Sequence, residues 1–470
     1  MEIINKDFKE TINTINKELR VDKSFDLIYR TFKIDDKKAS LYFIDGFAKD
    51  DILQKLMQYF MDMSNEDNID NYYDFLKTKL PYIEVDVCDE LEKLKLNVLS
   101  GVIALVIEGY EKIILIDART YPMRSIEEPT KDKVFRGSKD GFVETLVSNT
   151  ALIRRRIRDT NLTFEIYTVG RISKTDVVVA YMNNKVDKKL LSNIKEKLNS
   201  IKVDSLSMNQ ESLAECLYKG KWFNPFPKFQ YTERPDTSAS AIMEGHIVIL
   251  VDNSPSAMII PVSFFDILEE ADDYYFPPIT GTYFRFTRVI VTLVALFLTP
   301  VYLLFAYGYV DTPKWLEFII IKDTINVPIL AQLLILEVAI DGMKLAAVNT
   351  PDMLNTPLSI IIGVVLGDAA VSSGWFNNEI MLYMAFVAFA NFTHGSFELG
   401  YALKFLRIFL LLTTSIFGLW GFIGGVIIIL LLVAFNKTVS NESYIYPLIP
   451  FNGKKLINIF IRRSKTHMNN

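Results

Sequence analysis

The sequence predicts a mixed α/β soluble region of two lobes at the N-terminus, followed by a C-terminal polytopic α-helical membrane domain. Residues 289–310 and 408–436 are uncharged and apolar, and each run reaches the roughly 20 residues that cross a bilayer core. Nothing before Thr287 resembles either run. The roughly 280 residues that precede them alternate β-branched runs with amphipathic patterns, enough for two soluble lobes.

The first lobe is expected over residues 1–135 and the second, with a linker, over residues 136–284. In the first lobe, 39–44 predicts a strand and 51–63 an amphipathic helix, and the runs 96–107 and 112–118 predict a hairpin. The rest of residues 1–80 reads as helical. In the second lobe we expect helices over 141–158 and 187–200. The strands expected there are 164–172, 176–182, 247–252 and 257–262, and the Pro- and aromatic-rich stretch 222–231 is expected to be a linker.

The membrane domain is expected over residues 285–436, with a basic cytoplasmic tail over 437–470. Its five expected spans are 289–310, 324–348, 357–375, 379–400 and 408–436. The last run would be about 43 Å long as one helix, more than the roughly 30 Å bilayer core. Its glycines, among them Gly418 and Gly421, permit a fold back into a hairpin, which would make six spans. A single tilted span is the competing interpretation.

Basic residues beside the spans set the expected topology. Arg285 and Arg288 precede the first span, Lys404 and Arg407 precede the last run, and the tail is rich in lysine and arginine. All three groups belong on the cytoplasmic face, and a hairpin in the last run satisfies this requirement. The charged start, Met1 to Arg20, has no apolar core, so no cleavable signal is expected and the N-terminal region stays cytoplasmic.

Three charged residues in an apolar segment are the first candidates for an ion pathway. Glu337, Asp341 and Lys344 are spaced to share one helical face, and charges at membrane depth normally line a bundle interior or a water-filled path. The alternative is a structural lock, in which Lys344 neutralises one carboxylate, and we weigh the two equally. Asp368, in the next apolar span, is a fourth candidate.

Two polar segments of the soluble region are candidates for structural contacts. Glu233, Arg234 and Asp236 form a compact group expected to make an ion-pair clasp.

The basic run of Arg154, Arg155 and Arg156 suits anionic headgroups or an acidic neighbouring subunit. A solvated helix face is favoured, because most such charge runs are of that kind.

Composition and missing motifs exclude several classes of function. The formal net charge of −5 and the pI near 5.5 argue against a nucleic-acid partner. Cys88 and Cys216 lack metal-site spacing and read as reduced thiols. A phosphate-binding loop, a dinucleotide-binding glycine turn and a His-Glu-x-x-His pair are all missing. We therefore expect no enzyme, no cofactor and no metal site.

The chain resembles the A-subunit family of bacterial spore germination receptors, and within it the stage V branch, over almost its whole length. In the soluble region, the matching segments are Ile126-Glu-Glu-Pro129, Arg136-Gly-Ser-Lys-Asp-Gly-Phe142, Asn149 to Arg156, Tyr231-Thr-Glu-Arg-Pro-Asp236 and Val251-Asp-Asn-Ser-Pro-Ser256. In the membrane region, they are Gly281-Thr-Tyr-Phe-Arg285, Glu337 with Asp341, Asn349-Thr-Pro351, Tyr383, Phe397-Glu-Leu399, Trp420 to Gly425 and Tyr446 to Gly453. Lys344 departs from the pattern, since relatives often carry arginine there.

The resemblance implies a multi-pass protein of the spore inner membrane whose N-terminal domain lies in the spore core. It implies a homo-oligomeric channel, a pentamer, for monovalent cations that amplifies the ion release of germination. The implied partners are membrane lipid, a small polytopic membrane protein and germination receptor subunits. A non-conducting scaffold, a nutrient receptor A subunit and a transporter of lipids or small solutes are the alternatives.

Overall fold

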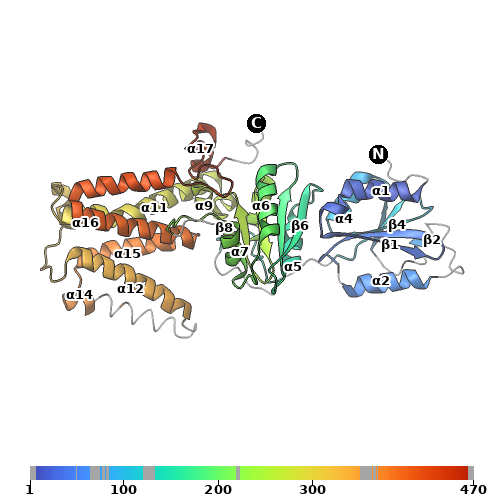
Figure 1. The fold of residues 1–470 in the computed structure, drawn as a ribbon, viewed down its shortest axis with the longest axis horizontal. Coiled ribbons are helices and arrows are strands. Elements are labelled where there is room, and N and C mark those ends of the chain that lie inside the picture. Colours follow the sequence, from blue (N-terminus) through green and yellow to red (C-terminus); the bar gives the residue numbers. More distant parts are fainter. Residues whose placement is uncertain are drawn as a thin grey trace. The chain divides into compact units, whose positions relative to one another are not determined.

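Two antiparallel sheets of five strands each form the N-terminal part of the computed structural model (Figure 1). The structure describes residues 7–48, 50–63, 75–76, 80, 84–119, 133–218, 223–349, 363, 367 and 369–463. Both sheets belong to one compact unit, unit 1, which comprises Met1–Gly220 and Phe229–Pro261. Unit 2 comprises Lys221–Lys228 and Val262–Asn470 and is helical.

The first sheet has the strand order β1-β2-β4-β5-β3. The strands are β1 (Leu27–Ile34), β2 (Lys37–Ile44), β3 (Val85–Cys88), β4 (Ile103–Ile107) and β5 (Ile113–Ile116). Helices α1 (Phe8–Leu19) and α4 (Leu91–Leu99) cover one face, and α2 (Asp50–Asp62) covers the other (Figure 1). Successive residues of β4 alternate between the two apolar cores, because side chains of a strand point to opposite faces in turn.

Two predictions for this sheet were wrong in part. The expected strand 96–107 begins as helix α4, whose buried residues Leu94 and Val98 are one helical turn apart, and β4 starts only at Ile103. Gly101, with a φ of +94°, lies between the two elements. Strand β1 was predicted as helix, because Tyr29 to Thr31 and Lys33 are exposed and interrupt the alternation of apolar and polar residues that marks a strand. The strand at 39–44 and the helix at 51–63 are confirmed as β2 and α2.

The second sheet has the order β6-β7-β9-β10-β8. Its strands are β6 (Leu162–Val169), β7 (Thr175–Met182), β8 (Gln230–Thr232), β9 (Ile247–Val251) and β10 (Ala257–Ile260). Helices α5 (Leu146–Arg156) and α6 (Lys188–Ser200) lie where the sequence predicts them, whereas α7 (Asn209–Leu217) and α8 (Pro235–Glu244) were missed. Proline in the first turn of α8 and Gly245 at its C-terminus, with a φ of +104°, are the ordinary signals for the ends of a helix.

Unit 2 is built of helices. They are α9 (Phe264–Leu268), α10 (Asp272–Tyr275), α11 (Pro278–Ala306), η4 (Lys314–Ile319), α12 (Ile329–Asn349), α14 (Ala370–Ser372), α15 (Asn378–Phe392), α16 (Phe397–Ala434) and α17 (Gly453–Phe460). Among the described residues, α11 and α16 are long and apolar enough to cross a membrane, and α15 is apolar but shorter. Most of the expected span 357–375 lies outside the described residues. The expected span 379–400 ends too late, because α15 ends at Phe392 and α16 starts at Phe397.

Helix α16 folds back on itself at Gly418, whose φ of 61° and ψ of −140° are not helical. Residues 397–417 form one arm and residues 419–434 the other (Figure 1). A Cβ at Gly421 would lie 1.9 Å from the carbonyl oxygen of Thr413, and one at Gly425 would lie 2.8 Å from Leu410. In a straight helix Gly421 and Thr413 would be about 12 Å apart. The expected hairpin in the last apolar run is therefore present, and glycines let its arms meet closely.

Candidate functional site in the helical unit

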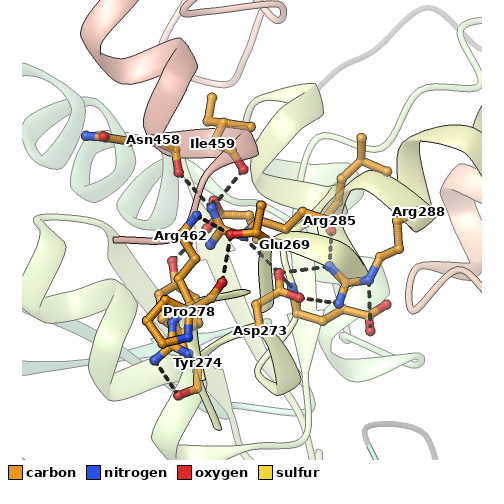
Figure 2. A network of polar contacts seen from close by, with 12 residues as sticks. Glu269, Asp273, Tyr274, Pro278, Arg285, Arg288, Asn458, Ile459 and Arg462 are labelled. Atoms are coloured by element: carbon orange, nitrogen blue, oxygen red, sulfur yellow. Dashed lines mark hydrogen bonds and ion pairs between the residues drawn. The ribbon is translucent and has the colours of Figure 1, made fainter. Parts of the chain in front are cut away.

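A buried network of charges holds the first turns of α11 (Figure 2). Asp273 of α10 is fully buried and accepts hydrogen bonds from Arg288 at 2.5 and 2.8 Å and from Arg285 at 3.3 Å. Glu269 lies 3.2 Å from Arg285, and Glu270 lies 3.3 Å from Arg288. A buried carboxylate is stable only when it is paired and hydrogen-bonded, and two arginines meet that need for Asp273.

Arg285 also ties α11 to the tail of the chain. Its guanidinium donates to the carbonyl oxygens of Asn458 and Ile459, at 2.7 and 2.8 Å, in the last turn of α17 (Figure 2). These carbonyls lack partners within the helix, and a cation there also meets the negative end of the helix dipole. Gly281 makes room for the contact, because a Cβ there would lie 2.2 Å from the carbonyl oxygen of Asp273 and 2.9 Å from Arg462. We call this assembly of α10, the start of α11 and α17 the foot.

A turn of the bundle packs against the foot. Gly395, between α15 and α16, lies close to the carboxylate of Glu270, so the first arm of α16 starts at the foot. Burial raises the pKa of Glu270, an effect that the neighbouring Arg288 partly opposes. His394, in the same turn, is buried, and its Nε2 atom has no hydrogen-bond partner among the described residues.

The segment before β8 also belongs to unit 2. Lys228 donates to the carbonyl oxygen of Lys437 at 2.5 Å and to the side chain of Asn436, and its ammonium lies 4.8 Å from the ring centre of Tyr444. Tyr444 is fully buried and donates to the carbonyl oxygen of Pro227. Burial lowers the pKa of Lys228 to about 8. The predicted linker 222–231 thus packs, over its described residues before β8, on the chain that follows α16.

The acidic face of α12 is paired with basic residues of α16. Glu337 is 2% exposed and binds Arg407 through two hydrogen bonds of 2.6 and 2.8 Å. Arg407 is fully buried and also donates to the carbonyl oxygen of Ala295 in α11. Lys404 pairs with Asp341 and donates to the carbonyl oxygen of Glu337 at 3.0 Å. These contacts join α11, α12 and α16 in one polar cluster.

Lys344 does not make the ion pair that the structural-lock interpretation gave it. Its ammonium lies over the rings of Phe392 and Tyr401, 5.0 and 5.5 Å from their centres. Lys404 and Arg407 neutralise the two acids instead. In the sequence, Lys404 and Arg407 serve only as topology signals, although their three-residue spacing places both on one face of α16.

Helix rise places these groups along the depth of the bundle. Arg285 marks the foot, and α11 rises about 15 Å from there to Ala295 and about 32 Å to Ala306. The Glu337–Arg407 pair therefore lies near mid-depth, beside Ala295. Beyond Ala306 is the far end, where Tyr309 contacts the Gly418 bend and the hydroxyl of Tyr307 accepts from Leu330 at the start of α12.

The far half of the bundle contains buried polar atoms without hydrogen-bond partners among the described residues. They are Thr299 Oγ1 and Tyr302 Oη of α11, Glu379 Oε2 of α15 and Thr414 Oγ1 of α16. The ring of Tyr302 packs on that of Tyr383, with centres 4.5 Å apart. Buried polar groups are normally hydrogen-bonded, so orphaned atoms at several places in one bundle call for water, an ion or a neighbouring chain.

The predicted clasp residues lie in unit 1, where Arg234 and Asp236 form an ion pair. Arg234 is 2% exposed, binds both oxygens of Asp236 at 2.6 and 3.1 Å, and donates to the carbonyl oxygen of Ser138. The backbone carbonyl of Glu233 accepts from Phe142 at 2.8 Å. These contacts hold the segment around Ser138 on the start of α8.

The basic run on α5 is not the solvated face that the sequence analysis favoured. Arg154 is 1% exposed and binds Asp26 of the first lobe through hydrogen bonds of 2.9 and 3.1 Å. Arg156 binds Asp140 at 2.5 and 2.7 Å, and Arg155 alone of the three is exposed. The run joins the two sheets of unit 1. Asp368 and the segment Ile126-Glu-Glu-Pro129 lie outside the described residues.

Fold and site together define a class of protein: an α/β unit followed by apolar helices that enclose paired charges. The family model described as Bacillus/Clostridium GerA spore germination protein matches residues 13–470. The chain therefore belongs to the GerA family of spore germination proteins, as the sequence analysis predicted from its motifs.

Three relatives and a solved structure show the extent of the similarity. Stage V sporulation protein AF of Bacillus subtilis is 34% identical over 94% of this chain and 90% of its own length. Spore germination protein B1 of the same species is 28% identical over 98% and 95%, respectively. The uncharacterized membrane protein YfkQ, also of Bacillus subtilis, is 29% identical over 98% and 89%. The crystal structure of the N-terminal domain of the A subunit of the Bacillus megaterium spore germinant receptor GerK3 is 26% identical, with a TM-score of 0.42. The match covers 56% of this chain and 97% of the chain in that crystal structure.

Proposed function

We propose that this protein is an ion-conducting membrane protein of the germinating spore. In this proposal unit 2 crosses the spore inner membrane several times, and unit 1 stays on the cytoplasmic side in the spore core. Two helices of sufficient length and apolarity support the membrane placement, as do the many large apolar side chains exposed on α11, α12, α15 and α16. The distance from the foot to the end of α11, about 32 Å, matches the roughly 30 Å hydrocarbon core.

The observation that carries ion conduction is the series of polar side chains through the depth of the bundle. Lys404 and Asp341 lie between the foot and mid-depth, Glu337 and Arg407 lie at mid-depth, and the orphaned atoms follow in the far half. An apolar environment tolerates such groups only where they are paired or reached by water and ions.

A homo-oligomer would complete the pathway. Glu337 is enclosed within one chain, but the side chain of Asp341 is 28% exposed and lies on α12 beside large exposed apolar residues. Val338 and Leu345 are 72% and 63% exposed, and nothing lies within 4 Å of a Cβ built at Gly342. A second copy that covers this face would place Asp341 and Lys344 at a boundary between subunits. Further partners in the proposal are subunits of germination receptors and a small polytopic membrane protein.

Potassium efflux from liposomes that contain the full chain tests this function. The parent should release potassium, and Asp341→Asn should change the rate, because Asp341 is the partly exposed acid of the series. The matched control is Asp323→Asn, an exposed acid between η4 and α12 that should leave the rate unchanged. Equal efflux rates for Asp341→Asn and the parent would show that this face of α12 does not line the ion pathway.

A non-conducting scaffold is the second candidate. The complete pairing of Glu337 with Arg407 within one chain favours it, because such a pair fixes helix packing without any ion flow. Purified protein that assembles in liposomes yet never releases potassium, with or without its partners, would support the scaffold. Catalysis is no part of either proposal.

A further inference from the structure

We propose that the segment 448–463, which contains α17, is an interfacial anchor that lies on the membrane surface and binds anionic lipid headgroups. The inference rests on the membrane placement in the proposed function, but not on ion conduction. It starts from a contrast of charge. The chain as a whole has a net charge of −5, whereas this segment holds Lys454, Lys455, Arg462 and Arg463 and no acidic residue.

The segment exposes apolar and basic side chains together. Its exposed large apolar residues are Leu448, Ile449, Phe451, Ile457 and Ile461, which are between 45% and 74% exposed. Lys454, Lys455 and Arg463 are exposed as well. None of these three basic residues is in an ion pair with a carboxylate that the structure describes. Basic residues interleaved with exposed aliphatic and aromatic ones are typical of helices that lie in the interface of an anionic bilayer.

Contacts with α11 fix the level of the segment. Arg285 donates to the last carbonyls of α17 (Figure 2). The ring of Phe460 packs on that of Phe286 of α11, with centres 6.0 Å apart. The backbone N–H of Arg462 donates to Thr282 at 3.1 Å. Arg285 lies about 32 Å below the end of α11, one hydrocarbon thickness from the far end. The anchor therefore lies at the level of the lipid headgroups.

The neighbouring surface of α11 has the same character. Tyr283 and Phe286 are 66% and 47% exposed beside α17, and aromatic side chains favour the boundary between headgroups and hydrocarbon. Apolar surface and positive charge at one level fit one occupant, an anionic lipid surface. A water-facing role would leave the apolar side chains without cover.

Spin labels on the full chain in nanodiscs test the inference. In a Cys88→Ala, Cys216→Ala background, a label at Ile457→Cys reports on the anchor, one at Ile290→Cys reports on α11, and one at Ile172→Cys is the aqueous reference. Collisions with oxygen and with a water-soluble nickel chelate give the depth of each label. With equal phosphatidylcholine and phosphatidylglycerol, the Ile457 label should lie between the other two. If the label at Ile457 collides with the nickel chelate as often as the label at Ile172, while the label at Ile290 lies in lipid, the anchor is refuted and the membrane placement of α11 stands.

The lipid that the purified protein retains tests whether the positive charge of the anchor binds anionic headgroups. Removing both lysines, in Lys454→Gln/Lys455→Gln, should lower the ratio of retained phosphatidylglycerol to phosphatidylcholine. The expected change is about fivefold per lysine, equivalent to about 1 kcal/mol each. Lys454→Arg/Lys455→Arg, which keeps the charge, should retain the parental ratio. Both lysines are exposed, so neither variant disturbs the fold. Equal ratios for the glutamine variant and the parent would contradict the inference.

Discussion

Removal of the Glu337 carboxylate should destabilise the helical unit strongly. In Glu337→Gln, the guanidinium of Arg407 would stay fully buried but lose its counter-charge and one of its two hydrogen-bond acceptors, because the amide NH2 group cannot accept. Lys404, whose ammonium lies 3.9 Å from Glu337, would keep Asp341 as its acidic partner, so Arg407 is the cation left without a counter-charge. Breaking a buried ion pair at one partner costs about 3–5 kcal/mol. At about 2–4 °C per kcal/mol for a unit of this size, the unfolding midpoint should fall by roughly 6–20 °C.

The double variant separates a broken pair from a lost contact. Glu337→Leu with Arg407→Met removes both charges and fills a similar volume, and such replacements are often neutral or stabilising. Fluorescence-detected size-exclusion chromatography after heating, in one detergent, gives the midpoints of parent, single and double variants. We expect the double variant to recover most of the loss. If Glu337→Gln melts with the parent, or if the double variant melts below Glu337→Gln, the assignment of Glu337 to a buried, charge-balancing pair is refuted.

Three further predictions concern the foot, unit 1 and the segment before β8. Gly281→Ala should loosen α17 from α11 at a cost of about 1–3 kcal/mol, because its Cβ overlaps the carbonyl oxygen of Asp273 and lies close to Arg462. The expected readout is faster proteolysis of the tail than in Gly424→Ala, at a helical glycine with nothing within 4 Å of its Cβ position. Equal rates count against the packing. Arg154→Gln should lower the free energy of unfolding by about 3–5 kcal/mol, against about 0.5 kcal/mol or less for Arg158→Gln, at an exposed arginine. Denaturant titration of both variants measures these losses. Losses of similar size would show that the pair with Asp26 does not stabilise the fold. Because the pKa of Lys228 is lowered in the folded protein, the unfolded chain binds more protons than the folded protein between pH 8 and 10.5. The free energy of unfolding should therefore rise with pH across that window, and Lys228→Met should remove part of the rise. Identical pH profiles for parent and variant would contradict the burial of this ammonium.

The periodicity of apolar residues predicted the elements whose buried residues recur at a regular spacing. Helix α2 buries its apolar stripe, and β7 buries its β-branched run, so the sequence pattern agrees with the structure for both. Strand β1 and helix α8 were missed for opposite reasons. Half of the residues of β1 are exposed, among them Arg30 and Lys33, and they hide the alternation. Helix α8 is short and starts with polar residues that also suit a loop.

The candidate site was predicted in part. The spacing of Glu337 and Asp341 placed both on one face of a helix, as the structure shows. Their partners come from α16, about 65 residues later, and no local spacing reveals which distant basic residue meets a buried acid. Arg154 shows the same limit, because its partner Asp26 lies in the other lobe. The hairpin in α16 was open to prediction, since four glycines interrupt a run too long for one span.

A density map of the assembly in a lipid nanodisc tests the central claim most directly. The claim is that the polar series of the bundle borders a passage for ions. The account predicts that Asp341 and Lys344 of each copy face a water-filled path between subunits, continuous with the polar atoms of Tyr302 and Glu379. A map in which the described face of α12 contacts only lipid, and every polar atom of the series is sealed within its own chain, would contradict it.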